Sequence, residues 1–307
     1  MDLAVIVVSW NVRQLLGGCL TSVKQSLADS ARLGAPLAAG IWVIDNASSD
    51  GSPDMVRTRF PDVHLVANRD NRGFAAANNQ GLTLALAHEP RHLLLLNPDT
   101  VVRGRALETL VRFLDTTERA GMAGARLVFG DGSFQHSAFA FPGLAQLAID
   151  LFPLPARLHD TRLNGRYPRA RYAADAPPFP VDHPLGAAML VRRTAVRDVG
   201  LMDTGYFMYC EEIDWAMRFR QAGWQIYCVP AAEIVHYGGQ STGQIRAASL
   251  VNLWHSRHRL YRRHCSPLTN WLASWLVRLA MSHRARQPGP QPLRDAYRQI
   301  AAIWSAP

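Results

Sequence analysis

Asp99 lies where metal or phosphate chemistry would need an acid. It follows the run Leu93 to Leu96 and the dipeptide Asn97-Pro98. Four consecutive leucines are typical of a strand buried on both faces, and proline ends such a strand because it cannot donate to the sheet. In open α/β sheets the ligand lies beyond the carboxyl ends of the strands, where an acid can hold a cation shared with substrate phosphates. An Asp here is also common as a turn or cap residue, so this position alone decides nothing.

A second group of acids comprises Glu211, Glu212 and Asp214. Acids at the start of a helix complement the helix dipole, which is a purely structural role. Carboxylates are also suited to accept a proton in general base catalysis. The residues by themselves leave both roles open.

A sheet that would bring these acids together is predicted by the N-terminal part of the chain. Apolar strands are expected at Leu3 to Ser9, Ile41 to Ile44, Val63 to Ala67 and Leu93 to Leu96. Helical periodicity follows the first, third and fourth of these, which is the βαβ pattern of a mostly parallel sheet with right-handed crossovers. A polar run follows each strand, as at 45 to 52, and such runs either form turns or bind a polar ligand.

The expected helices run from Leu15 to about Ala31, from Ala75 to about Ala87 and from about Arg105 to Arg119. Asn71 and Gly73 lie at the mouth of the second helix, where backbone amides can face an anion. Residues 137 to 180 show no clear period, and a connection this long inside a compact domain is usually functional or mobile.

The composition is that of a globular chain of 307 residues, 48% apolar, with room for one large α/β domain and an appendage or for two small domains. The N-terminus runs directly into a strand, so we expect no secretion signal. The cysteines are scattered without Cys-x-x-Cys pairing, which favours reduced thiols in the cytoplasm and disfavours a zinc site. They are Cys19, Cys210, Cys228 and Cys265.

The formal net charge of +9 is concentrated in the C-terminal part. Residues 246 to 307 contain ten Arg and one acid, Asp295, whereas residues 1 to 245 contain 23 basic and 23 acidic residues. A basic segment of this kind suits an anionic membrane surface or a nucleic acid.

Four motifs occur in order along the chain: V-V-S-W-N at 7–11, I-D-N-A-S-S-D-G at 44–51, N-R-G-F-A-A-A-N at 71–78 and L-N-P-D at 96–99. Together they closely resemble the motifs of family 2 glycosyltransferases, and above all the rhamnosyltransferase-like enzymes of bacterial polysaccharide and O-antigen assembly. The resemblance covers about residues 3 to 245. It implies the GT-A fold, an α/β fold with a mostly parallel central sheet flanked by helices.

The resemblance also implies a division of the chain. Residues 1 to 245 would form the GT-A catalytic domain, with a donor-binding half to about 103 and an acceptor half from about 104. Residues 246 to 307 would form a basic, amphipathic helical extension.

A nucleoside-diphosphate sugar is the donor that the resemblance implies, with Asp45 and Asp50 helping to hold its base and ribose. Gly186 belongs to a segment that resembles the family's strand beside the donor sugar, where small residues let substrate approach the backbone. The implied donor-binding residues are Ser9, Asn11, Asp45, Asn46, Asp50, Asn71, Gly73, Phe74, Asn78, Asn97 and Gly186.

A divalent metal, Mg²⁺ or Mn²⁺, is implied at Asp99, which matches the acid of a DXD-type motif. Asn97 stands where the first Asp of that motif is usual, and its amide oxygen is a weaker ligand than a carboxylate. His236 resembles a family His near the diphosphate and is a candidate second ligand, with a structural role equally open. Gly238 and Gly239 then indicate a loop that closes over the donor.

The segment around Glu211 resembles the family's Glu-Asp-x-Asp motif, with Glu212 at the position of the catalytic base. Glu replaces the usual Asp, so Glu211 and Asp214 remain candidates beside Glu212. A sugar hydroxyl must lose its proton as it attacks the anomeric carbon, which requires a carboxylate within hydrogen-bond reach. A metal at Asp99 would stabilise the leaving diphosphate, and one base with one metal suffices for a single displacement with inversion.

The C-terminal part is expected to begin with a helix from about 245 to 264. An apolar stripe then falls at helical spacing: Leu268, Trp271, Leu272, Trp275, Leu276 and Leu279. The segment is too short and interrupted to span a bilayer, which needs about 20 apolar residues. The stripe suits either the plane of a membrane interface or packing against the catalytic domain.

The sequence therefore predicts an inverting glycosyltransferase that moves a sugar, such as rhamnose from dTDP-rhamnose, to a glycan or lipid-linked glycan acceptor. We expect it in the cytoplasm, peripheral on the inner face of the cell membrane. One alternative is a nucleotidyltransferase that makes sugar nucleotides, but residues 9 to 13 lack its Gly-rich basic loop. The other is a basic nucleic-acid-binding protein; no motif favours it, and no nucleic acid partner is expected.

Overall fold

Strand β1 (Leu3–Ser9) alternates its side chains between two hydrophobic cores, one on each face of the central sheet. Leu3, Val5 and Val7 enter one core, and Ala4 and Ile6 enter the other. The strand is a continuous apolar run because both of its faces are covered. The computed structural model describes residues 1–238 and 246–305, and within this range the central sheet has ten strands.

The other strands of this sheet are β2 (Ala39–Asp45), β3 (His64–Ala67), β4 (His92–Leu96), β5 (Thr100–Val102), β6 (Ala120–Val128), β7 (Phe134–Gln135), β9 (Phe179–Pro180), β11 (Ala188–Arg192) and β12 (Gln225–His236). The order is β3-β2-β1-β4-β11-β6-β12-β5, with β7 on β6 and β9 on β12. Strands β3, β2, β1 and β4 run parallel, and β11 runs antiparallel to β4. The carboxyl ends of four strands therefore meet at one edge of the sheet.

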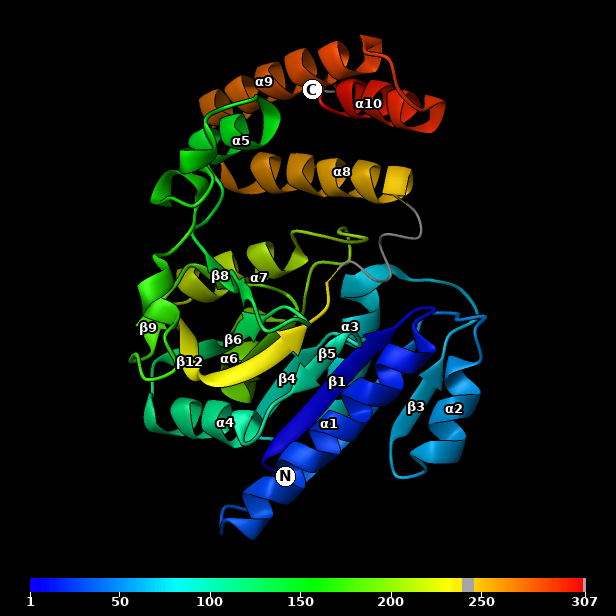
Figure 1. Cartoon of the computed structure of the whole chain (residues 1–307), viewed down its shortest axis with the longest axis vertical. Coiled ribbons are helices and arrows are strands. Elements are labelled where there is room, and N and C mark those ends of the chain that lie inside the picture. Colours follow the sequence, from blue (N-terminus) through cyan, green and yellow to red (C-terminus); the bar gives the residue numbers. More distant parts are fainter. Residues whose placement is uncertain (239–245, 306–307) are drawn as a thin grey trace.

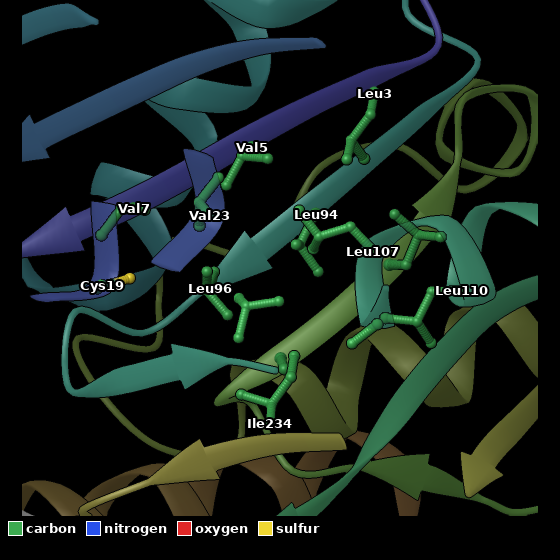
Figure 2. Packing of buried hydrophobic residues seen from close by; sticks show 14 of the residues in the cluster. Leu3, Val5, Val7, Cys19, Val23, Leu94, Leu96, Leu107, Leu110 and Ile234 are labelled. Atoms are coloured by element: carbon green, nitrogen blue, oxygen red, sulfur yellow. The ribbon is translucent and has the colours of Figure 1, made fainter. Parts of the chain in front are cut away.

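Helices cover both faces of this sheet. Helices α1 (Arg13–Arg32), α2 (Ser52–Arg59) and α4 (Ala106–Thr116) pack on the face shown in Figure 2. Helices α3 (Gly73–Leu86), α6 (Arg193–Val199) and α7 (Glu211–Gln221) pack on the other. The leucines of β4 divide between the two cores in alternation, which confirms the predicted strand buried on both faces.

Three further helices follow residue 245: α8 (Arg246–His264), α9 (Pro267–Arg286) and α10 (Gln291–Ile303). With α5 (Leu144–Leu151) they enclose a third core around Trp254, Tyr261 and Trp304. Helices α9 and α10 lie at one end of the long axis of the molecule, and the sheet lies toward the other (Figure 1). Among the described helices, none is both long enough and apolar enough to cross a membrane.

The connection from 137 to 180 is built from short elements, which is why its sequence shows no period. It contains α5, β9, the strand β8 (Ala138–Phe139), which pairs with β10 (His183–Pro184), and three turns of 3-10 helix at Ala156–Leu158, Arg162–Asn164 and Arg169–Tyr172. Helix α5 packs with the C-terminal helices, so the predicted boundary at 245 separates it from its packing partners. Residues 239–245, including Gly239 of the predicted closing loop, lie outside the described residues.

The strands and helices predicted in the first hundred or so residues are confirmed with shifts of a few residues at their ends. Helix α2 is not predicted by the sequence pattern, because its first turn, Ser52-Pro53-Asp54, continues the polar run after β2.

A close backbone contact joins α3 to the segment that leads into α7. Gly73 has a φ of 79°, and a Cβ at this position would lie 2.2 Å from the carbonyl oxygen of Phe207. The backbone N–H of Phe74 donates to the same oxygen at 2.7 Å. The N-terminal strands and the acids at 211 and 212 are thereby held in one arrangement.

Gly73→Ala is expected to lower the melting temperature, with a loss of about 2 kcal/mol or more, because alanine combines a positive φ with a clash against backbone. Gly18→Ala is the control: Gly18 lies in α1, and a Cβ there meets nothing within 4 Å. That variant should be neutral or gain up to ~1 kcal/mol from helix propensity. Equal melting temperatures for the two variants in thermal unfolding would contradict the assigned contact.

Candidate active site

A cavity of about 250 Å³ lies at the edge where the parallel strands end. Its wall combines the ends of β1, β4 and β12, the first residue after β2, the start of α3 and the segment that enters α7. The lining residues are Val8, Ser9, Trp10, Asn46, Gly73, Phe74, Asn97, Pro98, Asp99, Leu185, Gly186, Ala187, Met208, Tyr209, Glu211, Glu212 and His236. Segments that are far apart in the sequence therefore share one cavity.

Most residues singled out from the sequence lie in this cavity. Asp99 and the pair Glu211 and Glu212 line it together, as do Ser9, Asn46, Gly73, Phe74, Asn97, Gly186 and His236. Six others do not line it and have protein partners elsewhere: Asn11, Asp45, Asp50, Asn71, Asn78 and Asp214.

Asp99 and His236 lie side by side because of strand pairing. Strand β12 runs antiparallel to β5, with His236 opposite Thr100, so its imidazole reaches the acid just before β5. The distance from His236 Nε2 to Asp99 Oδ1 is 3.4 Å. His236 Nδ1 lies 3.2 Å from Gln135 Oε1, which can accept a proton from Nδ1; in that neutral tautomer the Nε2 lone pair faces Asp99.

This pair suits a cation. A neutral Nε2 and a carboxylate oxygen at this spacing repel each other unless a proton or a metal ion lies between them. Both residues are buried at the cavity wall, at 6% exposure for Asp99 and 7% for His236, so water screens that repulsion little. Within 1–238 and 246–305, no group of three or more His, Cys, Asp or Glu side chains converges on one point, so further ligands would come from amides, water or substrate.

Glu211 and Glu212 occupy the first turn of α7. Burial raises the pKa of Glu211 well above its usual range, and the charge of Glu212 raises it further. Burial also raises the pKa of Glu212, to about 7. The Glu212 carboxyl lies beside the backbone of Gly186, where a Cβ would be 3.8 Å from Glu212 Cδ. The pair thus carries one readily exchanged proton near neutral pH.

A strained turn aims these two acids into the cavity. Tyr209 and Cys210 both have positive φ, 71° and 66°, which non-glycine residues rarely adopt. Helix α8 helps to hold this turn, since Ser256 Oγ donates to the carbonyl of Met208 at 2.7 Å. Leu260 of α8 packs against Cys210 in a small separate core.

Asp214, in the same first turn of α7, forms ion pairs. Arg218 Nε donates to its Oδ2 at 2.9 Å, and His264 Nε2 lies 2.7 Å from its Oδ1. Burial opposes ionisation of Asp214, but the hydrogen bonds from His264 and Arg218 outweigh it and lower the pKa. Its carboxylate therefore links α7 to α8 and lies outside the cavity.

Asparagine amides join the ends of β2 and β3 to the start of α3. Asn46 donates to Asn71 Oδ1 at 3.2 Å and to the carbonyl of Gly73 at 3.1 Å, and it accepts from Asn68 at 3.1 Å. Asn71 also accepts the backbone N–H of Gly73 at 2.9 Å. Asn78 donates to the carbonyl of Phe74, inside the first turns of α3. These amides fix the loop on which Gly73 and Phe74 reach the cavity.

Asn11 and Asp50 organise the loops behind the cavity. Asn11 Oδ1 accepts the backbone N–H of Ser49 at 2.8 Å. Asp50 accepts the N–H of Arg13 at 2.7 Å and that of Ser52 at 3.0 Å, which are the first residues of α1 and α2. Asp45 is buried, and its Oδ1 accepts the N–H of Ser48 at 2.9 Å.

Sequence reasoning did not single out several of the lining residues. Trp10 follows Ser9 at the end of β1, and an aromatic residue at a strand end was a usable signal. Met208 and Tyr209 line the cavity because of the strained turn before α7, and no rule of sequence spacing predicts that turn. Leu185 and Ala187 flank Gly186.

Comparison with known proteins shows the family. The model of "Glycosyl transferase family 2" matches residues 4–199, so the chain belongs to this family and is a glycosyltransferase. An N-acetylglucosaminyl-diphospho-decaprenol L-rhamnosyltransferase of Mycobacterium tuberculosis is 31% identical over 227 residues, covering 69% of this chain and 70% of that protein. A rhamnosyltransferase of Escherichia coli is 29% identical over 149 residues, covering 48% of this chain and 52% of that protein.

A solved structure shares the fold over nearly the whole chain. It is a mannosyltransferase from Pyrobaculum calidifontis in complex with GDP-Man and Mn²⁺, with a TM-score of 0.55 and 16% identity, covering 99% of this chain and 84% of that one. The predicted GT-A fold is confirmed. Neither alternative function finds support among these relatives.

Glu211→Gln is expected to change stability in a pH-dependent way. Folding raises the pKa of Glu211, so the folded protein binds a proton here that the unfolded chain releases, and stability falls as pH rises above the unfolded value. Glutamine does not ionise, so the melting temperature of the variant relative to wild type should rise by at least ~2 °C between about pH 5 and about pH 8. Glu118→Gln, at an exposed acid, is the control. If the difference in melting temperature between Glu211→Gln and wild type did not change with pH, Glu211 would not have the raised pKa described above.

Proposed function

We propose that the protein is an inverting, metal-assisted glycosyltransferase. It moves a sugar, rhamnose in the leading case, from a nucleoside-diphosphate sugar to a glycan or lipid-linked glycan acceptor in cell-surface polysaccharide synthesis. The observation that carries this proposal is that Asp99 and the pair Glu211 and Glu212 line one cavity. The mycobacterial relative, named for rhamnosyl transfer to a diphospho-decaprenol acceptor, supports the sugar and the acceptor class.

The donor base and ribose are assigned to the ends of β1 and β2. Ser9 Oγ and Asp45 Oδ2 are buried, and within the described part of the chain neither has a hydrogen-bond partner. Unpaired buried polar atoms are costly, and ribose hydroxyls or base edges are groups that would satisfy them. Asn11, Asp50, Asn71 and Asn78 contribute by holding the loops around the donor.

The divalent ion, Mg²⁺ or Mn²⁺, is assigned to Asp99 and His236; Asn97 lines the same cavity and is a further candidate ligand. When bound, such an ion neutralises negative charge on the leaving diphosphate. Gln135 keeps the imidazole in the orientation that this role needs, as partners of metal-binding histidines commonly do.

Glu212 is the proposed base. It accepts the proton of the acceptor hydroxyl as that oxygen bonds to the anomeric carbon, while the bond from this carbon to the diphosphate oxygen breaks. A pKa of about 7 leaves Glu212 ionised in a large share of molecules at neutral pH and keeps it basic enough to take the proton. Glu211 stays protonated beside it, so the pair carries one charge. Asp214 is assigned to positioning α7.

We place this activity at the cytoplasmic face of the cell membrane. A lipid-linked acceptor is presented there, and residues 246 to 307 hold the excess positive charge of the chain. Anionic lipid attracts such segments.

Glu212→Gln is expected to lower turnover by about 10²- to 10⁴-fold while donor affinity stays within a few-fold, because the amide cannot accept a proton. In wild type, turnover should rise with pH and level off above about 7, as Glu212 loses its proton. Product formation over a pH series and calorimetric titration with donor measure the two quantities. Unchanged turnover in Glu212→Gln would move the base to Glu211 or Asp214.

Asp99→Ala is expected to abolish the metal-dependent part of donor binding. In a thermal-shift screen of UDP, GDP and dTDP sugars with and without Mn²⁺ or Mg²⁺, a matching donor stabilises wild type by mass action, by about 2.7 kcal/mol at a hundredfold excess over Kd. In the variant, adding metal should no longer increase the rise in melting temperature that the donor causes. Asp54→Ala, at an exposed acid of α2, is the control. If added metal raised the melting temperature of donor-bound Asp99→Ala as much as that of wild type, Asp99 would not be a metal ligand.

A further inference from the structure

Helix α9 has one buried face and one exposed apolar face. Ala273, Val277, Ala280 and Met281 are buried against the neighbouring helices. On the opposite side, large apolar side chains at helical spacing remain exposed: Leu268 at 66%, Trp271 at 63%, Trp275 at 54% and Leu279 at 50%. We call these four residues the outer face of α9.

This arrangement corrects one of the two sequence expectations for the stripe. Leu276 packs partly into the helical core, but the outer face does not pack against the described part of the chain. Scattered exposed apolar residues are ordinary, whereas a continuous row that includes two tryptophans marks a contact surface. The row spans about 16 Å along the helix, three turns at 1.5 Å per residue.

Positive charge lies on the same side of α9. Arg278 and Arg286 fall at helical spacing with Trp271, Trp275 and Leu279, and both are exposed. Tryptophan prefers the headgroup level of a bilayer, and arginine is attracted by anionic lipid. An exposed apolar row with tryptophans and neighbouring arginines therefore presents the side chains that a membrane interface favours.

Charge also distinguishes a bilayer from a second copy of this chain. Arg278 and Arg286 are exposed beside the outer face, and face-to-face pairing of two copies through α9 would bring these charges together. Like charges across an interface oppose association, whereas an anionic bilayer supplies the opposite charge.

The position of α9 in the fold fits a flat partner. The helix lies at one end of the long axis of the molecule, with α8 between it and the sheet (Figure 1). A planar surface can therefore meet the outer face of α9 at that end of the molecule.

We propose that the outer face of α9 is a docking surface for an anionic lipid bilayer, with Trp271 and Trp275 at the headgroup level and Arg278 and Arg286 against lipid phosphates. The role of this docking surface rests on the proposed function, because membrane contact is useful to an enzyme whose acceptor is linked to lipid. The binding itself is a property of α9 and does not depend on turnover.

The test is co-sedimentation of the full chain with vesicles of mixed phosphatidylglycerol and phosphatidylcholine. Wild type is expected to bind, to bind less at raised salt, and to bind weakly to vesicles of phosphatidylcholine alone. The double variant Trp271→Ala/Trp275→Ala should bind about tenfold more weakly or worse. Arg278→Glu/Arg286→Glu should lose mainly the salt-sensitive part. Leu33→Ala, at a residue 64% exposed beside α1, is the matched control and should bind as wild type does.

Fluorescence separates insertion from adhesion. Brominated lipid should quench more of the tryptophan emission in wild type than in the double variant, because only wild type places indoles among the lipids. Equal binding and quenching in both proteins would overturn the proposal. So would a wild-type dimer that the double variant makes monomeric, with no vesicle binding by either. Failure of the proposed function has a different signature: no transfer to any acceptor while vesicle binding is retained.

Discussion

The constraint on which this structure depends is the burial of the central strands on both faces. Strands β1 and β4 send alternate side chains into two separate cores, so they have no place for a polar side chain along most of their length. Polar groups gather only where the strands end. Because the strands are parallel, these ends share one edge, and Ser9, Asn46 and Asp99 reach the same cavity from three strands. The cavity is thus a consequence of how the sheet is covered.

The second half of the site depends on a turn that is unfavourable by itself. Tyr209 and Cys210 adopt positive φ, at roughly 1–3 kcal/mol each, and contacts from α3 and α8 stabilise this geometry. The first turn of α7 then contains three acids, Glu211, Glu212 and Asp214, and each lies in a different environment. Asp214 is neutralised by ion pairs, Glu211 is held protonated by burial, and Glu212 titrates near neutrality. Neighbouring carboxylates whose environments separate their pKa values are suited to different tasks.

The strands of the first hundred residues, and the polar residues that follow them, can be predicted closely from the sequence, because they depend on local signals. A leucine run ended by Asn-Pro-Asp and a polar run after each strand are visible without any tertiary contact. What the sequence does not reveal depends on pairing between distant segments. No local pattern brings His236 to Asp99; the family resemblance alone suggested it, and the register of β12 on β5 is its structural cause. The ion pairs of Asp214 depend in part on His264, fifty residues away. The packing of α5 with α8, α9 and α10 is hidden for the same reason.

The contacts of α8 tie the C-terminal helices to the segment that carries Glu211 and Glu212. Ser256 donates to the carbonyl of Met208, before Glu211, and His264 contacts Asp214, after Glu212. Helix α8 therefore contacts the chain on both sides of the proposed base. The same helix shares a core with α9 and α10, through Trp254 and Tyr261. Helices α9 and α10 are therefore linked, through α8, to the segment that leads into α7.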